Sequence, residues 1–161
     1  QLHFARSAAE GLLGDVSASL EHATRAVAIA SDCGATALLE SALVNVAHCQ
    51  ILLGLHREAE HTFAKLEAAR VPSVGRELII RGNQLLLATA LRDERLATDV
   101  DSRYGQIAAD QSLTTAQWYK LEAVGYHLAF GRADEAIRLG QRCIAEPTEV
   151  DRDYLSRAEV A

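Results

Sequence analysis

The stretch LLGLHREAEHTFAKLEAARVP, residues 52–72, decides the fold. Gly54 ends an apolar helical pattern, and glycine takes the left-handed conformation after a helix at low cost. A second helical pattern follows, in which Ala59, Phe63 and Leu66 return at the spacing of one helix face. The stretch therefore predicts two helices joined by a tight turn.

The same pattern returns along the chain with a period of about 39 residues. In each copy, a residue at a helix end is followed five positions later by a small residue. The helix ends are Gly14, Gly54, Arg92 and Gly131, where Arg92 stands in a weaker copy without glycine. The small residues are Ser19, Ala59, Ala97 and Ala136, which lie 40, 38 and 39 positions apart. A small residue early in a second helix lets two antiparallel helices approach closely, so each copy predicts a helical hairpin.

Composition agrees with an all-α chain. The 161 residues are 49% hydrophobic but only 5% aromatic, with two prolines and ten glycines, so the core is built from Ala, Leu, Val and Ile. The net charge of −6 disfavours binding to nucleic acid or to an anionic membrane. Three widely spaced cysteines form no CxxC motif and indicate buried thiols in a reducing cytoplasm.

Four hairpins and the start of a fifth are expected in one domain, 1–161, which we interpret as a piece of a larger protein. The units cover 1–34, 35–73, 74–111, 112–148 and, in part, 149–161. First helices are predicted over 2–13, 36–53, 74–91 and 112–130, and second helices over 16–33, 56–70, 93–109 and 132–146. A ninth helix is predicted over 149–161.

The copy from Leu43 to Pro72 resembles a tetratricopeptide (TPR) repeat, and the copy around Gly131, Ala136 and Ile137 is similar. The resemblance implies an α-solenoid, a right-handed superhelix whose first helices line a concave groove. The long period resembles the TPR-like arrays of large bacterial LuxR-type, MalT-like transcription activators.

The hairpin register predicts which residues are buried. Gly54 and Gly131 should occupy turns with positive φ. Buried positions are expected at Ala59, Phe63, Leu66, Ala97, Ala136 and Ile137, and exposed positions at Glu58, Glu60, Arg132 and Glu135.

No catalytic or metal-binding motif is present, so we expect neither an enzyme nor a cofactor. His56 and His61 are five residues apart, whereas two metal ligands on one helix face prefer a separation of four. Asp93 is expected to cap a helix.

The binding candidates are polar or aromatic residues on first helices, and their tips should reach solvent. Under the TPR resemblance they are Asn45, His48, Asn83, Trp118 and Glu122, with Phe4 in the first unit. An interhelical hydrogen bond is the alternative for each Asn, and packing is the alternative for Trp118. A carboxylate clamp is not supported, because the places that would need cations hold Ile79, Gly82 and Leu121.

The expected function is a non-catalytic scaffold that binds a protein, a peptide or another domain of the same protein in its groove. The alternative is a sensor or coupling segment of a bacterial transcriptional regulator, which binds a small effector or its own output domain. Neither nucleic acid nor membrane is an expected partner. Self-association through the open carboxyl-terminal end, near Tyr154 and Leu155, is a further expectation.

Overall fold

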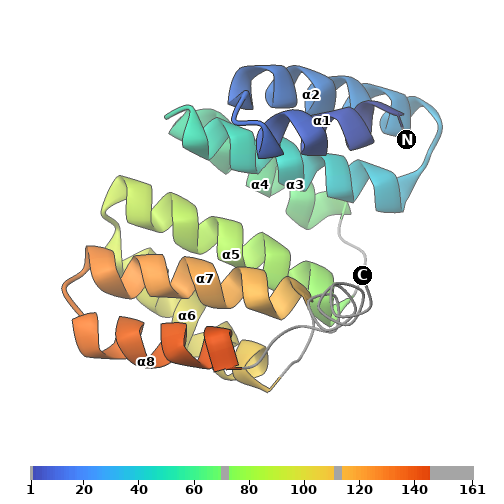
Figure 1. Ribbon diagram of the computed structural model, residues 1–161. Coiled ribbons are helices and arrows are strands. Elements are labelled where there is room, and N and C mark those ends of the chain that lie inside the picture. Colours follow the sequence, from blue (N-terminus) through green and yellow to red (C-terminus); the bar gives the residue numbers. More distant parts are fainter. Residues whose placement is uncertain (1, 70–72, 111–113, 146–161) are drawn as a thin grey trace, which may run out of the picture. The chain divides into compact units, whose positions relative to one another are not determined.

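The computed structural model describes residues 2–69, 73–110 and 114–145, and its regular elements within these ranges are all α-helices (Figure 1). The helices are α1 (Leu2–Leu12), α2 (Val16–Asp32), α3 (Thr36–Leu52), α4 (His56–Ala69), α5 (Val74–Leu91), α6 (Glu94–Ala109), α7 (Thr114–Ala129) and α8 (Ala133–Ala145). They fall into two compact units, Gln1–Pro72 with α1 to α4 and Ser73–Ala161 with α5 to α8.

The all-α prediction is confirmed, and the eight helices begin and end within two residues of the predicted bounds. Each predicted pair of helices is joined by the expected short turn. The ninth helix over 149–161 lies outside the described residues. The single domain and the superhelix stay predictions.

Five turns share one backbone device, the left-handed residue that ends a helix. Gly54 has a φ of 74°, its N–H donates to the carbonyl of Ile51 (3.0 Å), and Leu55 N–H donates to the carbonyl of Gln50 (2.8 Å). This pair of bonds is the Schellman motif, which satisfies carbonyls that the end of a helix leaves open. Equivalent motifs occur at Gly14, Gly34, Arg92 and Gly131, where the residue after the left-handed one bonds back five positions. The expected positive φ of Gly54 and Gly131 is confirmed.

Two aspartates make the turns especially short, because each serves two helices at once. Asp15 and Asp93 complete the Schellman bond of the preceding helix through their N–H groups. Their side chains then cap the next helix, where Asp15 accepts from Ala18 N–H (2.9 Å) and Asp93 from Leu96 N–H (3.0 Å). The expected capping role of Asp93 is confirmed.

Arg92 takes the left-handed conformation without being glycine, at φ 58°. A side chain in this conformation costs roughly 1 kcal/mol. The same side chain donates from Nη1 to the carbonyl oxygen of Ala129 at the end of α7 (2.6 Å). The turn of one hairpin therefore caps the end of the first helix in the following hairpin.

In the second unit, α7 packs against α5, α6 and α8. Its inward side chains Tyr119 and Tyr126 are almost fully buried and are among the largest in the core. The small residues Ala97 and Ala136 are buried at the predicted close approaches. In the first unit, α3 packs against both α2 and α4, and the buried side of α2 is formed by the small residues Ser19, Ala23, Ala26 and Ala30.

The burial predictions are confirmed for Ala59, Phe63, Leu66, Ala97 and Ala136, but the prediction for Ile137 is wrong. Its side chain is 57% exposed. Adjacent helix residues point about 100° apart. The buried side of α8 is narrow, with Ala136 and Cys143 as its buried residues, and Ile137 points away from it. Glu58 and Glu60 are exposed as expected, whereas Arg132 and Glu135 are only partly exposed. Cys33 is exposed, which corrects the prediction of three buried thiols.

One substitution made at two glycines should have opposite effects on stability. A Cβ at Gly54 or at Gly125 would meet nothing within 4 Å, so only the backbone distinguishes the sites. Gly54→Ala should lower the free energy of unfolding by about 1 kcal/mol, because its φ is positive. Gly125→Ala, within α7, should raise it by about 0.5–1 kcal/mol. Urea unfolding measures both, and equal signs would contradict the turn assignment.

Truncating Phe63 should be far more costly than truncating Ile137. Phe63 is 6% exposed, so Phe63→Ala leaves a cavity and should lower the free energy of unfolding by about 3–5 kcal/mol. Ile137→Ala removes a side chain that is mostly in water and should change it by less than about 0.5 kcal/mol. Thermal or denaturant unfolding of the two variants tests the inward face of α4.

Candidate functional site

The five predicted binding residues lie on first helices but in two different units. Asn45 and His48 are partly exposed on α3 in the first unit. The other three are Asn83 on α5 and Trp118 and Glu122 on α7, all in the second unit. The side chain of Phe4 lies outside the described residues. A common groove that includes both sets stays a prediction.

Asn83 does not reach solvent, which corrects the expectation for its tip. It is 2% exposed, and its Nδ2 donates to the carbonyl oxygen of Ile79 one turn earlier in α5 (2.9 Å). A buried amide needs such partners, because losing its contact with water is otherwise costly. Asn83 therefore belongs to the interior of the second unit.

Trp118 lies where α5 and α7 approach closely. An ideal Cβ at Gly82 would stand 3.1 Å from Trp118 Cδ1 and 3.4 Å from Tyr119 Cα. Glycine at position 82 therefore makes room for the indole ring and for the backbone of α7. Trp118 remains partly exposed, so it serves packing and still presents some of its surface.

Glu122 lies one turn after Trp118, on the same face of α7. Burial raises the pKa of its carboxyl group from the usual 4.5 to about 7, because a carboxylate there loses hydration. No hydrogen bond or ion pair joins Glu122 to the other residues that the structure describes. The site is therefore a partly buried acid beside an aromatic ring.

A buried polar cluster between α6 and α7 was not predicted from the sequence. Tyr119 donates its hydroxyl proton to Asp101 Oδ1 (3.2 Å), and Asp101 Oδ2 lies 3.6 Å from His127 Nε2. Burial lowers the pKa of His127, and the charge of Asp101 opposes this shift. Burial also raises the pKa of Tyr119. In the sequence, the one local feature that could have indicated this cluster is Gly105. A Cβ at this position would stand 3.0 Å from Asp101 Oδ1, so glycine leaves room for the carboxylate.

A second cluster joins the ends of two hairpins. Arg132 Nη2 lies 2.6 Å from Glu94 Oε1, and Arg132 Nη1 donates to the hydroxyl oxygen of Tyr126. That hydroxyl also lies 3.0 Å from Thr98 Oγ1, and the Arg132 guanidinium stands 4.9 Å from the centre of the Tyr126 ring. The Arg132 guanidinium and the Tyr126 hydroxyl group are thus both bound by neighbouring side chains. The cluster joins the start of α8 to α6 and α7.

The polar groups buried in the first unit also satisfy one another. Ser19 donates to the carbonyl oxygen of Ser7 (2.8 Å) and lies 3.2 Å from Cys49 Sγ. Burial raises the pKa of Cys49, which keeps it a thiol rather than a nucleophilic thiolate. The Nδ1 atoms of His3 and His22 lie 3.3 Å apart, within reach of a hydrogen bond between α1 and α2.

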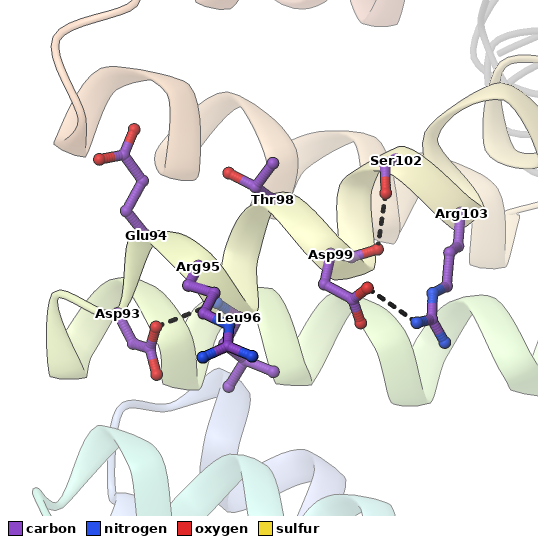
Figure 2. A pocket seen from close by; sticks show the side chains of 8 residues that line it. All are labelled: Asp93, Glu94, Arg95, Leu96, Thr98, Asp99, Ser102 and Arg103. Carbon is purple, nitrogen blue, oxygen red and sulfur yellow. Dashed lines mark hydrogen bonds and ion pairs between the residues drawn. The ribbon is translucent and has the colours of Figure 1, made fainter.

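The surface hollow shown in Figure 2 is formed by one side of α6. Its lining residues all belong to α6 or to the cap before it, and they are Asp93, Glu94, Arg95, Leu96, Thr98, Asp99, Ser102 and Arg103. Arg103 pairs with Asp99 (2.8 Å) and Ser102 bonds to the Asp99 carbonyl (3.0 Å). With its lining on a single helix, the hollow is an open surface and offers no set of converging groups for catalysis.

Two further findings concern the described ranges as a whole. Within residues 2–69, 73–110 and 114–145, no three His, Cys, Asp or Glu side chains gather where they could hold one metal ion. None of the helices in these ranges has the length and apolar character needed to cross a bilayer.

Replacing Glu122 with glutamine should stabilise the protein in a pH-dependent way. In the folded chain, the Glu122 carboxyl group keeps its proton up to about pH 7. In the unfolded chain, the same group loses its proton near the ordinary pKa of 4.5. The unfolded state therefore binds fewer protons between these values, and stability falls as pH rises through them. Glu122→Gln should have little effect on the free energy of unfolding near pH 4. Above pH 7 it should raise this free energy by about 1–2 kcal/mol, a value that allows for partial solvation of the carboxylate.

Denaturant unfolding across this pH range measures the difference between the two proteins. Glu60→Gln, at an exposed glutamate of α4, is the matched control and should leave the profile unchanged. A gain from Glu122→Gln that is the same at acid and alkaline pH would contradict burial of the charge.

Comparison with known proteins assigns neither a family nor a site. No protein-family model, no curated protein and no solved structure matches the chain. The fold and the site described above rest on the residues of the chain and their geometry.

Proposed function

We propose that the chain is a non-catalytic scaffold of helical hairpins that binds a protein or peptide, with a basic side chain of the partner placed at Trp118 and Glu122. The observation that carries this proposal is the position of a partly buried carboxyl group one helix turn from a partly exposed indole. The carboxyl group has no cation beside it among the described residues.

A lysine or arginine fits this pair chemically. The carboxylate supplies an opposite charge, and the face of an aromatic ring attracts cations within about 6 Å of its centre. A cation bound there favours ionised Glu122 and offsets the desolvation that raises its pKa. The net charge of −6 also favours the approach of a basic partner.

The hairpin repeat supports the scaffold part of the proposal. Each hairpin is closed by the same kind of turn, and in the second unit the two first helices, α5 and α7, pack against each other. The proposal includes the solenoid arrangement that the TPR resemblance implies, with first helices along one groove. Asn45 and His48 on α3 are further candidates for that groove.

Fluorescence of Trp118 tests the proposal directly, because it is the one tryptophan in the sequence. The probes are short peptides with a central lysine or arginine, each matched to a peptide with glutamine in its place. Basic peptides should change the emission and bind more tightly as pH rises through about 7, since binding favours the ionised carboxylate. Glu122→Gln should weaken binding by about tenfold, the effect of losing roughly 1.4 kcal/mol.

Glu60→Gln provides the matched control and should bind like the wild type. Trp118→Phe keeps an aromatic face and, followed by calorimetry, should bind more weakly than wild type but more tightly than Trp118→Ala. Equal binding by the lysine and glutamine peptides, or binding unaffected by Glu122→Gln in a folded protein, would disprove a basic-residue site.

A further inference from the structure

Two histidines from neighbouring helices face each other on the first hairpin. His3 lies in the first turn of α1 and His22 in the second turn of α2, and both side chains are partly exposed. Their Nδ1 atoms are 3.3 Å apart. The ring centroids are 5.5 Å apart, so each ring turns its Nδ1 edge toward the other. The hairpin therefore holds two nitrogen ligands face to face.

The distance between these nitrogens matches that of two ligands on one tetrahedral metal ion. Zinc binds a histidine nitrogen at about 2.0–2.1 Å, so two such nitrogens on one tetrahedral ion are about 3.3–3.4 Å apart. Both nitrogen lone pairs also have to point at the ion. The last side-chain torsion of histidine has a broad range, so small rotations of the two rings would aim both lone pairs at one point.

The backbone around the pair is fixed by other contacts. Ser7 lies one turn after His3, and Ser19 lies one turn before His22. Both serines are buried, and the Ser19 hydroxyl donates to the carbonyl oxygen of Ser7 (2.8 Å). The two serine hydroxyl oxygens lie 3.2 Å apart. Helices α1 and α2 are thus held in this register without a metal ion, so binding one needs only side-chain rotation.

We propose that His3 and His22 form a binding site for a divalent transition-metal ion of the Zn²⁺ class, which ties α1 to α2. Imidazole nitrogens suit such ions, whereas Mg²⁺ and Ca²⁺ prefer oxygen ligands. Within the described ranges no third His, Cys, Asp or Glu joins the pair, so water completes the coordination of the ion. The two ligands are 19 residues apart on different helices, which is why the sequence contains no motif for them.

A hydrogen bond between the two rings is the other use of this geometry. Such a bond needs a proton on the Nδ1 atom of one ring, whereas a metal ion needs both Nδ1 atoms without protons. Metal binding therefore requires that each neutral ring carry its proton on Nε2. The two uses exclude each other, so one experiment can distinguish them.

Thermal unfolding of the whole chain, freed of metal with a chelator and then measured with and without Zn²⁺, tests the proposal. Micromolar Zn²⁺ should raise the Tm, because the ion binds the folded hairpin and not the unfolded chain. The Tm should continue to rise with the logarithm of the Zn²⁺ concentration. Mg²⁺ at the same concentrations should leave the Tm unchanged.

Single substitutions identify the ligands. His3→Gln and His22→Gln should each weaken Zn²⁺ binding by at least about tenfold, because each removes one of the two imidazoles. The double variant should lose little more of the Zn²⁺ response than either single variant, since both rings bind the same ion. His61→Gln, at an exposed histidine of α4, is the matched control and should respond like the wild type. Each variant is compared with itself without Zn²⁺, so its own change in stability does not enter.

NMR signals of the histidine Cε1–H groups provide a second measurement. The chain has six histidines, and Zn²⁺ should shift the signals of His3 and His22 most strongly. A wild type whose Tm and signals do not respond to Zn²⁺ would show a hydrogen bond only and overturn the proposal. A response that survives both single substitutions, or that His61→Gln abolishes, places the ion elsewhere and overturns it as well. None of these results bears on the basic-residue site, because Trp118 and Glu122 lie in the second unit.

Discussion

The four helical hairpins depend on one backbone constraint, the left-handed residue that closes the turn of each hairpin. At these positions the chain leaves one helix and enters the next with almost no loop, because the carbonyls at the end of the first helix are satisfied by the N–H groups that begin the turn. Asp15 and Asp93 shorten the connection further by capping the following helix. Within each hairpin, the short connection forces the two helices to be antiparallel neighbours, and the small residues at their contact then permit close packing.

Two arginines link the turns of the successive hairpins in the second unit. Arg92 bonds from the turn after α5 to the end of α7, and Arg132 bonds from the turn after α7 back to Glu94 at the start of α6. The two contacts run in opposite directions between the same two turns. They join residues 37 and 38 positions apart, which is nearly one repeat. Residues about one repeat apart in the sequence are therefore in direct contact in the structure.

The helices were predictable because their signals are local, whereas the site was predictable only in part. The sequence indicated Trp118 and Glu122, but it gave no sign that Asn83 is buried. Glycines and capping residues mark helix ends within a few positions, so the bounds agree closely. The face that a residue presents depends on tertiary packing, and this explains the errors at Ile137 and Asn83. Spacing placed Asn83 in a groove, but α5 is buried on several sides and Asn83 lies inside. The raised pKa of Glu122 arises from burial that no local pattern encodes.

Arg92 also bears on the order in which the second unit forms. A disordered chain reaches the left-handed conformation much more readily at glycine than at arginine, so the α7–α8 turn at Gly131 closes more often than the α5–α6 turn. The bond from Arg92 to Ala129 can form only once α7 is in place. The α5–α6 turn therefore gains its side-chain support from a later part of the chain. The α5–α6 turn and the docking of α7 therefore stabilise each other, which couples the two hairpins of the second unit during folding.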